Sequence, residues 1–314
     1  MLGGGSGLSV LLRGLKQLVD GRDRLTAVVT VSDDGGSSGR LRRELGVLPP
    51  GDIRNCIVAL ADDEDLLARL FQYRFPNGNG LSGHSFGNLF LTALTGVTGD
   101  FYQAISTAEQ ILSVRGRILP ATLGDVRLVA RGLSGERYDG ESAIGRSGER
   151  LATLELQPAT AVAFAPAVEA LEQADLVVLG PGSLYTSILP NLLIPGIRRA
   201  LRRSSAPKIL ALNLMTQPGE TDGMTAADHL EAIRLHAGDG LVDSVLINAS
   251  RPADVLLRRY ADASSQWIEA DRNALEAFGV RVAERELLLD DDELIRHDPR
   301  RLARAVVDLA TRLR

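Results

Sequence analysis

The fold can be predicted from one stretch, Asp175-Leu-Val-Val-Leu-Gly-Pro-Gly-Ser183, in which consecutive apolar residues lead directly into a loop of small residues. Continuous rather than alternating apolarity is typical of a strand that is buried on both faces of a parallel sheet. Three further runs have the same character: Leu25–Val31, Lys208–Leu214 and Val242–Asn248. Together the four runs predict the strands of a mainly parallel sheet.

Helical patterns of apolar residues lie between and around these runs. They cover Leu8–Val19, Asn55–Tyr73, Phe86–Leu94, Phe101–Val114, Leu192–Arg203 and Ala226–Ala237, with an amphipathic basic helix at Arg300–Arg314. Strands that alternate with helices predict an α/β protein with a doubly wound sheet and helices on both of its faces.

The stretch from about residue 117 to 158 has a different pattern. Short strand-like runs at Val126–Ala130 and Leu151–Leu156 are separated by glycine-containing turns. We therefore expect one α/β domain over residues 1–314, with a small β-rich insertion at about residues 117–158.

The composition excludes several classes of protein. Of the 314 residues, 45% are hydrophobic and 24% are charged, which is ordinary for a globular protein with a sizeable core. The net charge of −5 and the lack of a basic, aromatic-rich stripe disfavour nucleic-acid binding. The single cysteine, Cys56, excludes an intrachain disulfide, and the four scattered histidines give no metal-ligand spacing. With no apolar stretch long enough to span a bilayer and no signal-peptide pattern, we expect a cytoplasmic protein.

Six loops of small residues lie at strand-to-helix connections. They are Gly3–Gly7, Ser32–Arg40, Gly51–Asn55, Gly83–Asn88, Gly180–Ser183 and Asn213–Thr221. In an open α/β sheet such loops meet at the carboxyl edge of the strands, where ligands bind. Their unhindered N–H groups suit a phosphate, so we expect a phosphorylated, nucleotide-linked small molecule.

The first of these loops, Gly3–Gly7, precedes an apolar helix and can offer N–H groups to a phosphate, although a plain tight turn is the simpler alternative. It does not match the dinucleotide fingerprint, and no P-loop lysine follows a glycine anywhere in the chain. Only Met1 and Leu2 precede Gly3. The strand that normally leads into such a loop is therefore expected to be missing, or to begin upstream of this sequence.

Asp33 and Asp34 follow a predicted buried strand, and of all the loop residues this pair gives the most specific indication of ligand binding. Their carboxylates could hold Mg²⁺ or the hydroxyls of a sugar or base, while Ser37, Ser38 and Arg40 could contact phosphate oxygens. The alternative is a solvated turn in which one aspartate caps a helix.

The remaining loops offer further polar groups. Asp52 could be a helix N-cap, and Arg54 could pair with it or face an anion. No Ser-His-Asp order is recognisable around His84 and Ser85, so ligand contact through Asn88 is preferred to catalysis. Gly180–Ser187 supplies hydroxyls beside glycines, and Asn213–Thr221 supplies donors and acceptors suited to a base or sugar, unless its Pro-Gly pair is merely a turn.

These loops resemble, in order along the chain, the signature stretches of the gluconeogenesis factors of the YvcK type, in the CofD-like superfamily. The stretches are Gly3–Leu8, Val31–Leu41, Pro50–Asn55, Gly83–Leu89, Arg115–Thr122, Gly140–Ile144, Gly180–Asn191 and Asn213–Thr221. The resemblance implies a Rossmann-like fold and binding of a nucleotide-sugar such as UDP-N-acetylglucosamine. It also implies regulation that links carbon metabolism and gluconeogenic growth to cell-envelope synthesis and cell shape.

The expected ligand-binding residues follow from the loops and the resemblance together. They are Gly4, Gly5, Ser6, Gly7, Asp33, Asp34, Ser37, Arg40, Asn55, Asn88, Gly180, Pro181, Gly182, Ser183, Thr186, Ser187, Asn213, Met215 and Thr216. No catalytic residue and no required cofactor are predicted, and an unidentified protein partner and a homo-oligomer are expected. The alternative is a Mg²⁺-dependent phosphotransferase, similar to the 2-phospho-L-lactate transferases of coenzyme F420 synthesis, with the metal at Asp33 and Asp34. An NAD-dependent oxidoreductase is disfavoured because the fingerprint is absent.

Overall fold

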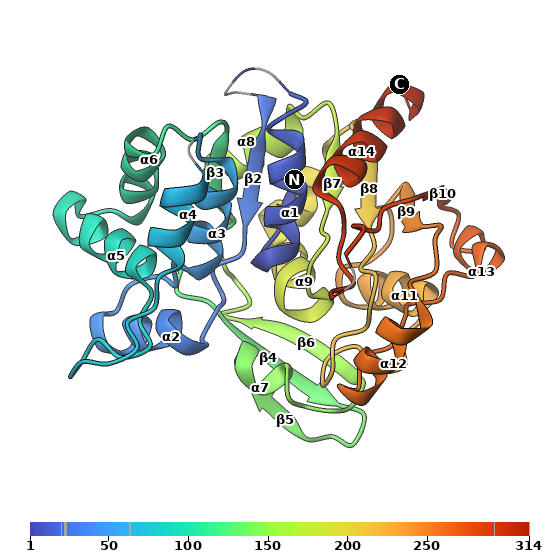
Figure 1. The fold of residues 1–314 in the computed structure, drawn as a ribbon, viewed down its shortest axis with the longest axis horizontal. Helices are drawn as coiled ribbons and strands as arrows, with labels where there is room; N and C mark the ends of the chain where they lie inside the picture. The colour runs from blue at the N-terminus through green and yellow to red at the C-terminus, as the bar shows by residue number, and fades with distance from the viewer. Residues whose placement is uncertain (20, 22–23, 63, 292, 314) are drawn as a thin grey trace.

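The computed structural model describes residues 1–19, 21, 24–62, 64–291 and 293–313, and it contains a seven-stranded parallel sheet (Figure 1). The strand order is β10-β9-β8-β7-β1-β2-β3, and every neighbouring pair runs parallel. The strands are β1 Leu2–Gly3, β2 Thr26–Val29, β3 Arg117–Pro120, β7 Val177–Leu179, β8 Lys208–Ala211, β9 Ser244–Asn248 and β10 Arg281–Arg285. The predicted α/β fold with a mainly parallel sheet is confirmed.

The first strand, β1, is present although only two residues long, which corrects the expectation that it is missing. Leu2 is fully buried and pairs with Val28 of β2 and Leu179 of β7 at the centre of the sheet. The amino group of Met1 donates a hydrogen bond of 2.7 Å to the Thr26 carbonyl, which extends the pairing by one residue. The two neighbouring strands thus fix β1 and aim Gly3 at the carboxyl edge of the sheet.

The sheet is doubly wound, and its winding reverses at β1. From β1 the chain moves outward to β2 and β3, whereas from β7 it moves in the opposite direction to β8, β9 and β10. Since crossovers between parallel strands are right-handed, the two halves place their helices on opposite faces. Figure 1 shows α1 and α14 in front of the sheet and α8 behind it. The boundary between β1 and β7 is the switch point at which such folds bind ligands.

Helices surround the sheet close to the predicted positions. The longer ones are α1 Gly5–Leu15, α2 Gly36–Leu45, α3 Gly51–Leu60, α4 Glu64–Gln72, α5 Phe86–Thr98, α6 Phe101–Ile111, α8 Ala165–Glu172, α10 Pro195–Arg203, α11 Ala226–Ala237, α12 Asp254–Asp262 and α14 Pro299–Leu313. Shorter helical segments are η2 Leu184–Ile188, a π-helix, with α9 Leu189–Leu193 and α13 Arg272–Glu276. The single helix predicted over Asn55–Tyr73 is in fact two, because the chain becomes extended at Ala61. No helix in the described ranges is long and apolar enough to cross a membrane.

The core continues from the sheet into the helix pair α1 and α14. Leu8, Leu11 and Leu12 of α1 are fully buried. A Cβ atom on Gly14 would collide with the backbone carbonyl of Pro299, so a residue without a side chain lets the predicted C-terminal helix pack on α1. The two ends of the described chain are thereby joined.

A second, antiparallel sheet of order β5-β4-β6 follows β3 and lies beside the carboxyl edge (Figure 1). Its elements are β4 Arg127–Gly132, β5 Arg137–Asp139, α7 Glu141–Ile144 and β6 Leu151–Gln157. Arg117–Pro120, which begins the stretch expected to be the insertion, pairs instead with β2 as β3 of the main sheet. The β-rich unit therefore starts about ten residues later than the sequence suggested.

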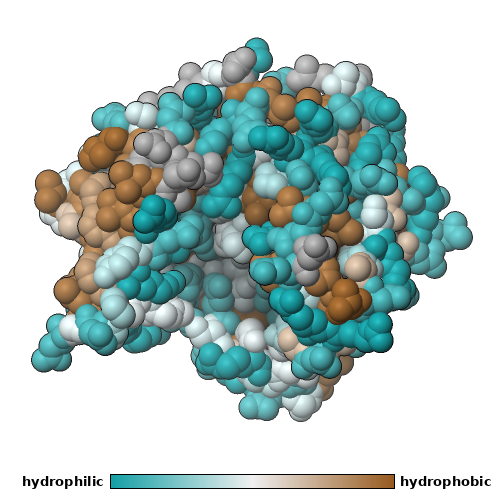
Figure 2. Space-filling view, viewed as in Figure 1, coloured by the Kyte–Doolittle hydropathy of each residue, from teal (hydrophilic) through white to brown (hydrophobic). Residues whose placement is uncertain are grey.

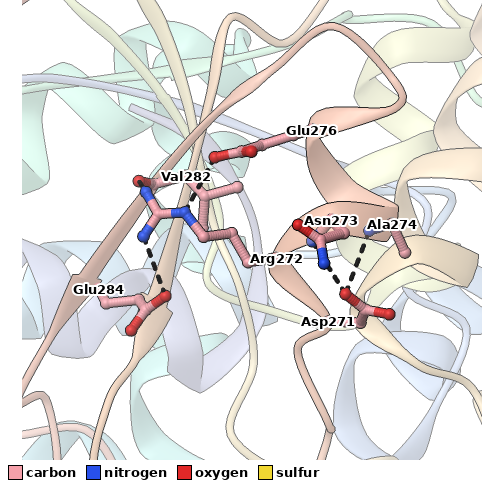
Figure 3. A network of polar contacts seen from close by, with 7 residues as sticks. All are labelled: Asp271, Arg272, Asn273, Ala274, Glu276, Val282 and Glu284. Carbon is pink, nitrogen blue, oxygen red and sulfur yellow. Dashed lines mark hydrogen bonds and ion pairs between the residues drawn. The ribbon is translucent and has the colours of Figure 1, made fainter.

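The far edge of the main sheet is held by a polar network at its surface (Figure 3). The guanidinium of Arg272 donates to Glu276, to Glu284 and to the Val282 carbonyl, at 2.9, 3.3 and 3.0 Å, and so ties α13 to β10. The Asp271 carboxylate caps α13 by accepting from two of its N–H groups. These exposed contacts order an edge strand and lie away from the loops of the carboxyl edge.

Candidate functional site

The candidate site is a hollow at the carboxyl edge of the main sheet. Figure 2 shows the surface hollowed between the corner that carries α2 and the small antiparallel sheet. The loops after β1 and β7 meet there: a Cβ on Gly7 would lie 2.5 Å from the Pro181 carbonyl oxygen, and one on Gly182 would lie 3.3 Å from that of Gly4. The switch point thus brings together Gly3–Gly7 and Gly180–Ser187, as the sequence predicts.

The N-terminus of α1 is already in contact with a carboxylate, that of Asp52. The Gly5 N–H donates to this carboxylate, and a Cβ on Gly4 would collide with it. Asp52 lies inside α3, whose N-cap is Pro50, so the interpretation of Asp52 as the N-cap of its own helix is wrong. Burial, with a further contribution from the charge of Asp33, raises the pKa of Asp52 to about 7.

A polar pocket of about 210 Å³ adjoins this contact. It is lined by Asp33, Gly35, Gly36, Ser37, Ser38, Gly51, Asp52, Arg54, Asn55, Arg74 and Asn88. These residues come from the loop after β2, from the starts of α2, α3 and α5, and from the segment before α5. Four residues expected from the sequence, Asp33, Ser37, Asn55 and Asn88, are therefore brought together in one pocket.

Arg54 is the centre of the hydrogen bonding in this pocket. Its buried guanidinium donates to Ser85 Oγ at 2.7 Å, to Asn88 Oδ1 at 3.1 Å and to Asn55 Oδ1 at 2.8 Å. These three acceptors are neutral, so they orient the guanidinium without cancelling its charge. Arg54 Nε is shielded from solvent and has no hydrogen-bond partner within the described ranges. Together with Arg74 on the pocket wall, it provides positive charge for an anionic group.

The carboxylates of Asp33 and Asp34, the pair expected to bind a metal or a sugar, have different hydrogen-bond partners. Asp33 Oδ1 accepts from the Gly35 N–H at 2.8 Å and faces the pocket, and burial raises its pKa. Asp34 Oδ1 instead accepts from the Ser142 N–H, at 2.9 Å, in the small sheet's α7. Among the described residues no group of three acidic, histidine or cysteine side chains is arranged to hold a metal ion. The geometry of this pair therefore does not make a ready metal cage.

Two of the groups expected to contact phosphate are engaged elsewhere. The hydroxyl of Ser37 lies 3.0 Å from Nδ1 of His84, and the Ser85 N–H also donates to it, at 3.4 Å. The Arg40 guanidinium lies against Gly83 and does not line the pocket. Both side chains instead hold the loop before α5, and Asn88 is the member of that loop that reaches the pocket.

The other half of the site is organised by Glu220 and Asn213. The buried Glu220 carboxylate accepts from the Tyr185 N–H at 2.8 Å and also from the Thr186 N–H and hydroxyl, and burial raises its pKa to about 7. Asn213 holds Gly182 twice, accepting from its N–H at 3.0 Å and donating to its carbonyl at 2.9 Å. Glu220 thus caps the π-helix η2 in the way a ligand phosphate could.

The remaining expected residues fall into two groups. Ser6 is exposed on the first turn of α1, and Ser183 Oγ accepts from Gln217 at 2.7 Å at the mouth of the loop. Met215 lies in a small apolar cluster with Leu214, Leu256 and Ile295, and Thr216 Oγ1 accepts from the Gln266 N–H at 2.8 Å. Met215 and Thr216 therefore hold the 265–267 segment and do not line the polar pocket.

Several residues of the hollow were missing from the expected set. Asp52, Arg54 and Glu220 lie in loops that the sequence identified, and Arg54 was considered for an anion without being included in the expected set. Arg74 and Glu141 had no local signal. Arg74 reaches the pocket because an antiparallel bridge pairs it with Ser85, and Glu141 arrives with the small sheet.

A second cavity, of about 450 Å³ and largely apolar, lies between residues 122–126 and 158–165. None of the residues expected to bind ligand lines it. Its walls consist of apolar residues with two threonines and a glycine, and it offers no charged group to an anion. The polar pocket at the switch point is therefore the better candidate.

Comparison with known proteins agrees with this architecture. The family described as 2-phospho-L-lactate transferase CofD matches residues 1–288. The gluconeogenesis factor of Halalkalibacterium halodurans is 46% identical over 308 residues, which are 98% of this chain and 95% of that protein. That of Bacillus subtilis is 46% identical over 310 residues, 98% of this chain and 96% of that protein. A solved structure of a UPF0052-family protein from Bacillus halodurans has a TM-score of 0.92 at 46% identity, covering 98% of this chain and 97% of that one.

Proposed function

This chain belongs to the gluconeogenesis factor family, with a CofD-type domain, and on that premise we propose that it binds a nucleotide-sugar such as UDP-N-acetylglucosamine. The observation that carries the proposal is Arg54. It is a buried guanidinium with three neutral partners and an unpaired Nε, at the edge of a polar pocket beside the switch point. A diphosphate is the kind of group that satisfies such a guanidinium.

The two halves of the hollow divide the ligand between them. The diphosphate binds near Arg54, Arg74 and the start of α2, where backbone N–H groups and two guanidinium groups meet. The nucleoside lies along Gly180–Ser187, a loop whose shape is fixed by Asn213 and Glu220. The carboxylates of Asp52 and Glu220 hold the N-termini of α1 and η2 in the free protein. They occupy those termini, which leaves the guanidinium groups of Arg54 and Arg74 to bind the phosphate.

The protein acts as a regulator without turnover in this proposal. The ligand favours the conformation that it binds better, and a protein partner in cell-envelope synthesis recognises that state. Such a signal would link carbon metabolism and gluconeogenic growth to envelope synthesis and cell shape, in the cytoplasm.

A calorimetric titration with UDP-N-acetylglucosamine tests the proposal, run with Mg²⁺ and with EDTA, and with GDP and NAD as comparators. We expect saturable binding of the UDP-sugar that persists in EDTA, and weaker or no binding of the comparators. Failure to bind any UDP-containing ligand under both conditions would remove the proposal.

A Mg²⁺-dependent phosphotransferase is the second candidate, and it is favoured by the description of the matching family as a 2-phospho-L-lactate transferase. Asp33 faces the same pocket as Arg54, so a metal there would lie beside a bound phosphate. This candidate requires that binding and turnover need Mg²⁺ and are lost in Asp33→Asn. Mg²⁺-dependent binding of GDP without binding of the UDP-sugar would favour it.

We also propose that the protein forms a homo-oligomer through the face of α4 and α5. Helix α5 contains no charged residue, Val97 on it is 84% exposed, and Leu66 of α4 is 65% exposed. Figure 2 shows apolar residues gathered over this corner of the molecule. A second copy of α5 can pack against this one without opposing like charges. Light scattering on a sizing column should give a dimer mass, and Val97→Glu should reduce it to that of a monomer.

A further inference from the structure

The small antiparallel sheet places one acidic side chain, Glu141, between the two halves of the hollow. Glu141 begins α7, directly after Gly140, whose φ of +92° is in the left-handed region. A Cβ at Gly140 would collide with the Asp34 carboxylate, so glycine is needed on both counts. The next residue, Ser142, donates its N–H to Asp34 at 2.9 Å, which fixes the start of α7 against the loop after β2.

The same segment is fastened on its other side to the loop that carries Glu220. The Ser147 hydroxyl donates to the Gly219 carbonyl at 3.0 Å, and the Gly148 N–H donates to the same carbonyl at 3.2 Å. Glu141 is therefore held between a loop of the pocket half and a loop of the nucleoside half. Its position is set by backbone contacts on both sides rather than by its own side chain.

One oxygen of the Glu141 carboxyl is left without a partner. This oxygen, Oε2, is shielded from solvent and has no hydrogen-bond partner among the described residues, although buried polar atoms are almost always paired. The largest electrostatic contributions to the pKa of Glu141 come from four acidic side chains: Asp52, Asp33, Glu220 and Asp34. Burial, followed by these negative charges, raises its pKa well above the ordinary value, which favours the neutral acid.

These observations define what could satisfy Glu141. An anion is excluded because five carboxyl groups would surround it. Within the described ranges no three-residue metal cluster is present, so a preformed metal cage does not explain the group. A neutral hydroxyl or amide N–H of a ligand remains, and it can bond to a carboxyl in either protonation state.

We infer that Glu141 recognises the sugar half of the ligand by accepting a hydrogen bond from a sugar hydroxyl or N-acetyl N–H. This inference rests on the proposed function and adds to it a specificity residue supplied by the small sheet. The diphosphate is held beside Arg54, and the sugar turns back from it toward the gap in which Glu141 lies. The nucleoside diphosphate without its sugar lacks this hydrogen bond to Glu141.

The test compares UDP-N-acetylglucosamine with UDP in Glu141→Ala and Glu141→Gln, by calorimetry in EDTA. In the wild type the UDP-sugar should bind more tightly than UDP. Glu141→Ala should lower the affinity for the UDP-sugar about tenfold or more, since a ligand donor loses its acceptor, while the affinity for UDP changes less than about twofold. Glu141→Gln keeps an acceptor oxygen and should recover part of the lost affinity.

Glu155→Ala is the matched control, because it removes an exposed glutamate of the same small sheet. It should leave both affinities unchanged. If Glu141→Ala does not fold, Glu141→Leu replaces it, because leucine has a similar size and no acceptor: a ratio of UDP-sugar to UDP affinity equal to that of the wild type then overturns the inference. An equal loss for both ligands, or a loss that appears only with Mg²⁺ present, also overturns it. If the wild type binds neither ligand, the proposed function fails together with this inference.

Discussion

The backbone approach between Gly7 and Pro181, where the loops after β1 and β7 meet, yields the sharpest prediction. Gly7 lies in the first turn of α1 with an ordinary helical φ, so alanine there causes no backbone strain. Its new Cβ, however, would lie 2.5 Å from the Pro181 carbonyl oxygen and 2.8 Å from the carbonyl carbon. Ordinary contact begins at 3.4 Å, so the loops after β1 and β7 would have to separate by nearly 1 Å.

The expected cost follows from this separation. Overpacking against backbone that cannot rotate away costs about 1–3 kcal/mol. Replacing a helical glycine with alanine stabilises the helix by roughly 0.8–1.0 kcal/mol, which offsets part of this cost. We therefore expect Gly7→Ala to lower the free energy of unfolding by up to about 2 kcal/mol in urea denaturation. Because the separated loops form the wall of the site, the Kd for UDP-N-acetylglucosamine should rise about tenfold or more, which is ~1.4 kcal/mol.

Gly96→Ala is the matched control, since Gly96 is also helical and a Cβ there has no atom within 4 Å. It should raise the free energy of unfolding by up to about 1 kcal/mol and leave the Kd unchanged. The reasoning would be refuted if Gly7→Ala stabilised the protein as much as Gly96→Ala and bound the ligand as tightly as the wild type.

Three further predictions concern the side chains of the hollow. Asp52→Asn removes the buried carboxyl whose pKa is raised from 3.8 to about 7 in the folded protein. The native wild type binds the extra proton, so its free energy of unfolding falls by up to about 4 kcal/mol as the pH rises from about 4 to about 7. In thermal unfolding at a series of pH values, the variant should not show this fall. Parallel pH profiles for both proteins would contradict this. Arg54→Lys cannot reproduce the forked hydrogen bonds and should weaken UDP-sugar binding at least tenfold; an unchanged calorimetric Kd would show that the ligand lies elsewhere. Asn213→Ala removes both hydrogen bonds that hold Gly182 and should cost about 1–3 kcal/mol in stability with a matching loss of affinity, whereas an unchanged Kd would disconnect this loop from the site.

Local chemistry explains why much of the fold could be predicted. Helix α11 has the predicted bounds because the side chain of Thr225 and that of Asp228 form a reciprocal capping box, and Gly238 follows its last residue. The strands were recognisable because both faces of the sheet are covered, which makes their sequences continuously apolar. The family resemblance drawn from the loops is confirmed by relatives that match nearly the whole chain.

Elements that depend on their neighbours could not be predicted. Strand β1 has two residues and no pattern of its own, and it forms because β2 and β7 pair with it on both sides. Strand β10 was missed because it carries charged residues at Arg281, Glu284 and Arg285 on an edge of the sheet. Its order comes from pairing with β9 and from the Arg272 network.

The position of the site was easier to predict than its members. The carboxyl edge of a parallel sheet gathers its loops whatever their sequences are, so their convergence was foreseeable. Which side chains point into the hollow depends on contacts made by distant segments. Thr216 was expected to bind ligand, but Gln266 uses its hydroxyl, whereas Arg74 and Glu141 enter from segments without any local signal.

A crystal structure of the complex with UDP-N-acetylglucosamine would test the central claim most directly. The account predicts the diphosphate beside Arg54, the nucleoside along Gly180–Ser187, and the sugar within hydrogen-bond distance of Glu141. A ligand bound instead in the apolar cavity between residues 122–126 and 158–165, with the switch-point hollow unchanged, would contradict it.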